Sequence, residues 1–206
     1  MTATEMTADA KLLIAQFDAA LGKLPSSQHL VIQRQVTDLF LGCAAFYSER
    51  HAAIFNGVMG RLIERIDRRG LLELSGRLAA VDNAPANVIG RLSNDNDIAI
   101  AGPVLEKSNV LTDENLVAIA KIKGQDHLAA IAGRKRISEI VTDVLIERGN
   151  SDVACKVAAN AGACFSEIGF VKVVHVARGN EALAMVLARR SDVPEELQPF
   201  LELARA

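Results

Sequence analysis

Tryptophan is absent from this 206-residue sequence, and Tyr47 is its single tyrosine. Aromatic residues make up 4% of the chain, although 50% of it is hydrophobic. The apolar residues are therefore mainly Ala, Leu, Ile and Val. Because small aliphatic side chains let helices approach closely, this composition favours layers of helices over a sandwich with an aromatic core.

Cysteine is also scarce, and Cys43, Cys155 and Cys164 form an odd count without a paired C-x-x-C spacing. This pattern fits neither a zinc site nor a secreted disulfide framework, so we expect reduced thiols. The N-terminus lacks the basic and apolar regions of a signal peptide, and no apolar run is long enough to span a membrane. We expect a soluble, cytoplasmic protein.

The chain has no excess of positive charge, because 23 Lys and Arg residues face 25 Asp and Glu residues for a net charge of -2. A protein that follows a phosphate backbone usually has a basic excess, so nucleic-acid binding is not expected. The sequence contains no nucleotide-binding glycine motif and no nucleophile elbow. The acidic run at residues 94–97 lacks the glycine and distant Glu of a calcium loop. We therefore expect no metal and no cofactor, and we identify no catalytic residues.

Helical periodicity is the dominant signal in what remains. In the first part of the chain it predicts four helices, at about residues 7–23, after Pro25, from Ser48 onward, and at 71–81. From Asp82 the predicted helices become shorter and the loops between them more regular. Their ranges are 85–92, 95–107, 112–123, 125–133, 137–148, 151–160, 166–178, 181–190 and 194–206.

Two kinds of repetition link these short helices. The tripeptide Arg-Gly-Asn occurs at 148–150 and again at 178–180, and Gly124 occupies a similar boundary. A basic residue, a glycine and a capping residue predict a helix end, a left-handed stop and the next N-cap. An apolar residue followed by small or apolar residues recurs at 100–102, 131–133, 157–159 and 186–188.

Helix pairs that recur at such intervals are typical of an α-solenoid, in which neighbouring units bury each other's apolar faces. We therefore predict an all-α fold with two parts. Residues 1–81 form an N-terminal helical bundle that caps the structure. Residues 82–206 form an α-α superhelix of variant HEAT-like repeats.

Four motifs occur in a fixed order: PVL-x-x-S at 103–108, H-x-x-AIA at 127–132, VTD-x-L-x-x-RG at 141–149 and R-x-D-x-P at 190–194. Together they resemble a family of uncharacterised alphaproteobacterial proteins that share a domain of HEAT-like helical repeats. The likeness extends over approximately residues 70–200 and implies a helical repeat fold, but no activity. Gly102 and Gly133 stand where the resemblance suggests basic residues. Fewer basic side chains are therefore expected on any surface that would bind an anionic ligand.

Polar residues at similar places in successive units form a candidate binding row. Its members are Asp97, His127, Arg134, Asn160 and Arg189. Solenoid repeats turn one helix face into a continuous surface, and Arg and Asn recognise carboxylate, phosphate or peptide groups. The alternative is that these residues are solvated helix ends between repeats.

The favoured function is a non-enzymatic interaction module, a protein-binding scaffold with a regulatory role. A small anionic-ligand or nucleotide sensor is the first alternative. The second is an enzyme on a HEAT-like scaffold, of the glycosylase or lyase type, because a fold alone does not exclude activity. A glycosylase would need a basic groove and aromatic residues for a flipped base, and this chain has few of either.

The N-terminal helices carry a second candidate surface, for self-association, composed of Phe40, Phe46, Tyr47, Phe55 and Met59. Apolar area beyond what caps the repeats would mark a contact with another protein. We predict a homodimer that forms through these helices. Light scattering over a range of protein concentrations tests this, and a mass that stays at the 22.1 kDa of one chain would contradict it.

Overall fold

The computed structural model describes residues 3–43 and 49–203, and every regular element in that part of the chain is a helix. The all-α prediction is therefore confirmed for the described residues. The helices are α1 (Ala3–Leu21), α2 (Ser26–Cys43), α3 (Glu49–Ile63), α4 (Arg68–Leu78), α5 (Ala86–Ser93), α6 (Ile98–Lys107), α7 (Asp113–Ile122), α8 (Gln125–Ala132), α9 (Glu139–Arg148), α10 (Ser151–Ala159), α11 (Glu167–Ala177), α12 (Glu181–Leu187), the short 3-10 helix η2 (Glu195–Leu197) and α13 (Gln198–Leu203).

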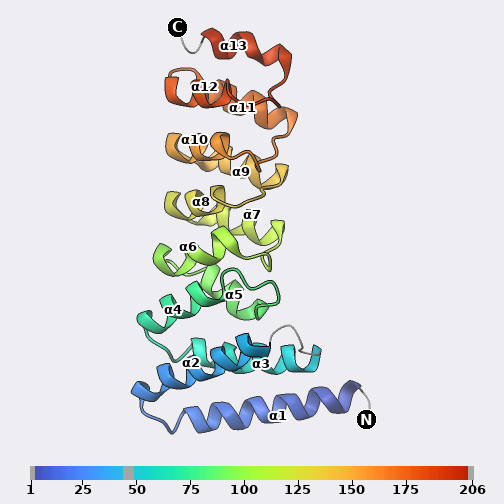
Figure 1. Ribbon diagram of the computed structural model, residues 1–206, viewed down its shortest axis with the longest axis vertical. Coiled ribbons are helices and arrows are strands. Elements are labelled where there is room, and N and C mark those ends of the chain that lie inside the picture. Colours follow the sequence, from blue (N-terminus) through green and yellow to red (C-terminus); the bar gives the residue numbers. More distant parts are fainter. Residues whose placement is uncertain (1–2, 44–48, 204–206) are drawn as a thin grey trace.

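Successive helices alternate between two layers. The even-numbered helices from α2 to α12 each contact the next member of their layer. In the other layer α1, α3 and α5 pack in succession, as do α7, α9, α11 and α13. Figure 1 shows the resulting elongated stack, with the two ends of the chain at opposite ends of it.

Local sequence fixes where many of these helices begin. The side chain of Thr112 accepts a hydrogen bond from the Asn115 amide, and the Asn115 side chain accepts one from the Thr112 amide, which makes a reciprocal capping box at the start of α7. Asn150, Ser166 and Asn180 each accept from an amide of the first turn of α10, α11 and α12. Such caps satisfy amides that have no partner inside the helix.

One apolar core runs through the stack. It includes Phe40 near one end and Leu201 near the other, and it continues without a break past residue 82. The helices do become shorter there, as expected: α1 to α3 have 19, 18 and 15 residues, and α5 to α12 have between 7 and 11. No described helix is both long and apolar enough to cross a membrane.

The glycines between helices do not all act as predicted. Gly179 has a φ of 91°, the left-handed conformation expected after a helix. Gly149 and Gly124 have φ values of -70° and -80°, so the prediction of a left-handed stop was wrong for both. At position 149 the chain needs glycine for space, because a Cβ would lie 2.4 Å from the carbonyl oxygen of Leu145.

The short apolar segments at 100–102, 131–133, 157–159 and 186–188 are also only partly in register with one another. Ile131 and Val157 each lie seven residues after the N-cap of their helix, at Gly124 and Asn150. Ile100 lies three residues after its N-cap and Val186 lies six, so these segments are not structurally equivalent. The physical reason is that buried positions recur at every helical turn, so the same short apolar string fits either turn.

The substitution Gly149→Ala tests the close approach at this junction. We expect it to destabilise the protein by about 1–3 kcal/mol, since the added methyl group displaces backbone or Val153. Gly76→Ala, in α4 with nothing within 4 Å of the added carbon, is the control and should stabilise by about 0.5–1 kcal/mol. Urea unfolding followed by circular dichroism measures both, and equal changes would contradict the steric account.

Candidate functional site

The five residues of the predicted binding row lie at two opposite edges of the even-numbered layer. Asp97 is the N-cap of α6, and His127 lies in the first turn of α8. Arg134, Asn160 and Arg189 follow the C-terminal ends of α8, α10 and α12. A helix of about ten residues separates its two ends by about 15 Å, so the structure does not bring the five residues together.

Asp97 and His127 both make contacts within the chain. The carboxylate of Asp97 accepts from Arg68 Nε at 2.6 Å and from the Ala99 amide at 3.0 Å. The Arg68 hydrogen bond, then that amide, hold the pKa of Asp97 below its usual value. His127 is buried, and its Nε2 lies 2.8 Å from the carbonyl oxygen of Asp95.

Arg134 is a buried cation that joins two helices of the same layer. It is only 9% exposed, and its Nη1 and Nη2 donate to the carbonyl oxygens of Leu105 at 2.6 Å and Ser108 at 2.8 Å. These carbonyls end α6, where helix geometry leaves them without an internal partner. Burial lowers the pKa of the Arg134 guanidinium, and the charge of Asp113 offsets part of that change.

Asn160 repeats this arrangement one helix further along. Its Nδ2 donates to the carbonyl oxygens of Ala132 at 2.9 Å and Arg134 at 2.7 Å, at the end of α8. Its Oδ1 accepts from the Gly162 amide at 2.8 Å. Asn160 therefore links α10 to α8 as Arg134 links α8 to α6.

The third member of this series is Arg190, which sequence reasoning missed in favour of Arg189. Its guanidinium donates to the carbonyl oxygens of Ala158, Asn160 and Ala163 at 3.1, 2.8 and 2.9 Å. Arg134, Asn160 and Arg190 each lie ten residues after the N-cap of their helix, at Gly124, Asn150 and Asn180. We call these three residues the carbonyl ladder. Counting from the caps would have found Arg190.

The opposite edge of the stack uses the same kind of bond. Arg148 Nη1, at the end of α9, donates to the carbonyl oxygen of Ala120 in α7 at 2.6 Å. Lys123, at the end of α7, donates to the carbonyl oxygen of Asn94 after α5, also at 2.6 Å. Basic residues at helix ends, interpreted from sequence as signs of a boundary, thus hold consecutive pairs of helices together.

The odd-numbered layer presents a surface that was not singled out from sequence. A groove of about 510 Å³ lies between α7 and α9. On the next helix of this layer, α11, Ile168 and Val171 are 67% and 56% exposed. The start of α11 contacts the groove through Ser166, whose Oγ donates to the Asp143 carboxylate at 2.9 and 3.0 Å. Ile140 of α9 is 53% exposed, and it and Ile168 each lie two residues after their N-caps. We call this surface the outer strip, composed of Val117, Ala118, Ile140, Val144, Ile168 and Val171.

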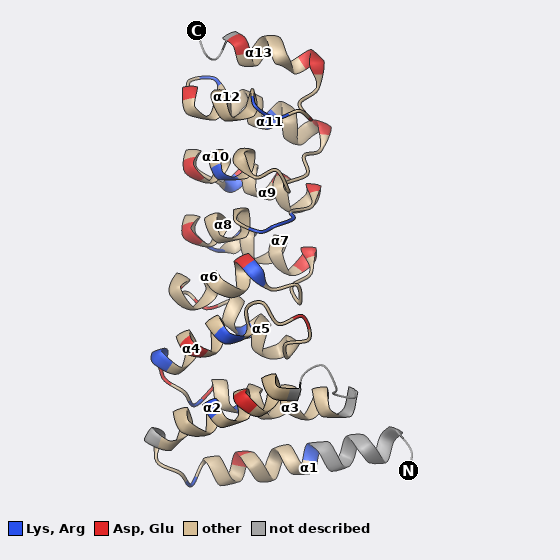
Figure 2. Cartoon of the chain, in the orientation of Figure 1, with Lys and Arg blue, Asp and Glu red and all other residues tan. Residues whose placement is uncertain are grey.

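Acidic residues border the outer strip. Figure 2 shows acidic segments in red where α7, α9 and α11 begin. The neighbouring charged residues are Glu114, Glu139, Asp143, Glu147 and Glu167, with Lys121 and Lys172 of opposite sign. Lys172 lies 3.3 Å from Glu147, so part of the positive charge is already paired.

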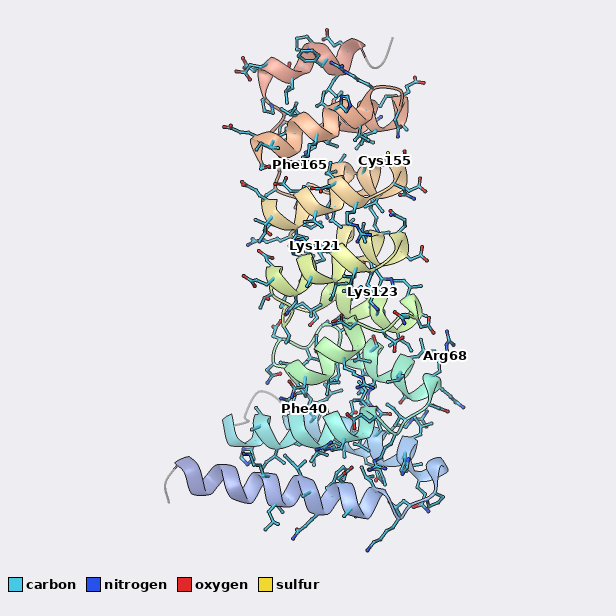
Figure 3. All side chains as sticks on the ribbon, turned by 180° about the vertical axis from the view of Figure 1, so that it is seen from behind. Phe40, Arg68, Lys121, Lys123, Cys155 and Phe165 are labelled. Atoms are coloured by element: carbon cyan, nitrogen blue, oxygen red, sulfur yellow. The ribbon has the colours of Figure 1, made fainter. Side chains whose placement is uncertain are left out.

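The residues proposed for self-association are mostly covered within the chain or outside the described part. Phe40 and Met59 are 1% and 2% exposed, and Phe55 packs against Phe40 with ring centroids 5.3 Å apart. Figure 3 shows Phe40 where α2 and α3 meet. Phe46 and Tyr47 lie outside the described residues. The dimer remains a prediction.

Asn160→Asp tests the carbonyl ladder. The new carboxylate would face two carbonyl oxygens that lose their donor, so we expect a loss of about 2 kcal/mol or more. The same change in Asn180→Asp should alter stability by less than about 0.5 kcal/mol, because that side chain accepts from the Leu183 amide as an N-cap. Urea unfolding at neutral pH compares them, and equally stable variants would show that the ladder contributes nothing.

Comparison with known proteins finds a match that covers part of the chain. No curated protein and no solved structure matches the chain. The alphaproteobacterial restriction and the HEAT-like character of the resemblance remain predictions. Residues 100–199, which include the carbonyl ladder and the outer strip, match the model of a family described as an uncharacterised protein conserved in bacteria (DUF2336).

Proposed function

We propose that this chain is a HEAT-like helical-repeat module that binds another protein, and that the outer strip receives a basic, amphipathic helix of that partner. The observation that carries the proposal is the exposure of large aliphatic side chains on neighbouring helices of one layer. Ile140, Ile168 and Val171 are each more than half exposed, on α9 and α11. Neighbouring exposed apolar groups on a folded chain mark an interaction surface.

The repeat interpretation is supported by the spacing of equivalent caps. The N-caps of α6, α8, α10 and α12 are Asp97, Gly124, Asn150 and Asn180, which are 27, 26 and 30 residues apart. Each helix pair contacts the pairs before and after it. Solenoid repeats of this kind form extended surfaces, and their function commonly lies in binding.

The shape of the outer strip suits a helical partner. The groove between α7 and α9 is floored by small and aliphatic side chains, with Ile140 and Val144 one helical turn apart. An amphipathic helix places its own apolar residues at spacings of three and four, which lets it lie in such a groove. Large aliphatic residues on α11 extend the contact beyond a single groove.

The charge around the strip determines which amphipathic helix it prefers. Five acidic and two basic residues are neighbours of the strip along its helices. The ion pair between Lys172 and Glu147 offsets one charge of each sign, which leaves four acidic residues and Lys121. Complementary charge at the rim of an interface accelerates association and excludes partners of like charge. The partner helix is therefore expected to carry Lys and Arg beside its apolar face.

A labelled peptide with one Leu-rich and one Lys-rich face tests this proposal by fluorescence anisotropy. We expect the double substitution Ile140→Glu and Ile168→Glu to weaken binding by about tenfold or more, which corresponds to about 1.4 kcal/mol. The control is Val31→Glu with Met185→Glu, which removes two exposed apolar side chains elsewhere and adds the same charge. A Leu-rich peptide with a Glu-rich face should bind weakly to every form. Equal binding by both variants would refute the outer strip as the site.

A further inference from the structure

The three positions of the carbonyl ladder differ in how their charge is balanced. At Arg190, Nε and Nη2 donate to the carboxylate of Asp192 at 2.8 and 2.6 Å. The guanidinium also lies over the ring of Phe165, 4.8 Å from its centroid. The hydrogen bonds from Arg190 hold the pKa of Asp192 below its usual value. This repeat thus supplies its own carboxylate, two residues after the ladder cation.

Arg134 occupies the same position of the carbonyl ladder, but the residues that follow it are basic and not acidic. Two residues after it, where the other repeat has Asp192, the chain has Arg136, and Lys135 stands between them. None of the ion pairs among the described residues involves Arg134. Its bonds to the carbonyl oxygens of Leu105 and Ser108 use two of the five N–H donors of a guanidinium.

Arg134 also lines a pocket of about 720 Å³ at the ends of α4, α6 and α8. The other lining residues are Ala80, Asp82, Glu106, Lys107, Asn109, Gly133, Lys135 and Arg136. Pockets that hold small molecules have volumes of about 300–1,000 Å³. The basic segment that follows α8 is drawn in blue in Figure 2. The pocket therefore has the size of a small-molecule site, and its wall includes Arg134, which forms no ion pair among the described residues.

Positive charge predominates in this pocket although the whole chain is slightly acidic. Four basic residues line it and two acidic ones, and Asp82 already accepts a hydrogen bond from Asn109 at 2.8 Å. A fifth cation lies beside it, because the Nζ of Lys156 would be 3.3 Å from a Cβ placed on Gly133. Glycine at that position leaves room for the ammonium group at the side of the pocket.

We infer that this pocket binds a phosphorylated small molecule, with Arg134, Lys135, Arg136 and Lys107 around the phosphate oxygens. A single carboxylate carries too little charge to neutralise this set, whereas a phosphate group carries up to two charges and presents several acceptor oxygens. The planar fork of an arginine donates two parallel hydrogen bonds to such a group. The inference is independent of the outer strip, which is formed by the odd-numbered helices.

Helix dipoles oppose this binding, so the side chains must provide it. The pocket lies at helix C-termini, which carry partial negative charge and repel anions. Carbonyl oxygens there are already covered: Arg134 binds the end of α6, and Asn160 binds the end of α8. Because the attraction comes from exposed lysine and arginine side chains, the affinity must fall as the salt concentration rises.

Calorimetric titration of the full chain with inorganic pyrophosphate tests the inference. The pocket variant combines Lys107→Gln, Lys135→Gln and Arg136→Gln, and it leaves Arg134 in place because that residue joins α6 and α8. The control variant combines Lys11→Gln, Lys23→Gln and Arg69→Gln, three exposed residues elsewhere with the same change in charge. We expect the pocket variant to bind pyrophosphate about tenfold more weakly or worse, and the control to change less than about twofold.

Several outcomes would overturn the inference. They are no binding of pyrophosphate at millimolar concentration, an equal loss in the two variants, or an affinity that does not fall with added salt.

Vesicles of phosphatidylcholine with phosphatidic acid test a lipid source of the phosphate. Sedimentation with these vesicles that pyrophosphate does not displace would assign the phosphate to a membrane surface instead. The variant with Ile140→Glu and Ile168→Glu should bind pyrophosphate unchanged, so failure of one proposal does not imply failure of the other.

Discussion

The structure depends on hydrogen bonds from one helix pair to the open carbonyl end of the pair before it. An α-helix leaves its last four carbonyl groups without internal partners, and in helices of 7 to 11 residues these are a large share of the backbone. Apolar packing cannot satisfy them. Arg134, Asn160 and Arg190 do so on one edge of the stack, and Arg148 and Lys123 on the other. The same bonds fix how far one pair can slide along the next.

Because the donor position is structural, its chemistry can vary without changing the fold. Asn160 is neutral, and Arg190 is paired with Asp192. Arg134 forms no ion pair among the described residues, and only the more distant charge of Asp113 acts on it. All three donate to carbonyl oxygens near the end of the preceding helix of their layer, so this contact does not require the charge of Arg134 to be paired inside the chain. A donor position that recurs in successive helix pairs, with one member outside any ion pair, is a physical route by which such a stack gains a locally charged surface while its architecture stays the same.

The helices could be predicted from sequence because their signals are local. Capping residues such as Thr112 and Asn150 identify helix starts within a residue or two. The carbonyl ladder was not predicted, because it depends on register between helices, which appears only when each residue is counted from its N-cap. Arg189 was chosen instead of Arg190, and both lie after the end of α12, where helical periodicity no longer indicates which side chain turns toward α10. Asp97 and Arg134 were assigned to one row although they lie at opposite ends of their helices.

The outer strip escaped sequence analysis for a related reason. In α9, the residues Ile140, Val141, Val144 and Leu145 are all aliphatic. Periodicity therefore shows that the helix is apolar, but not which of its faces stays exposed after it packs into the layer. Stacking resolves this, since Val141 and Leu145 are fully buried while Ile140 remains half exposed. A helix needs only one apolar face to join its layer. The exposed aliphatic residues of α9 and α11 are thus not required by the stack, which is the physical reason for proposing that a partner covers them.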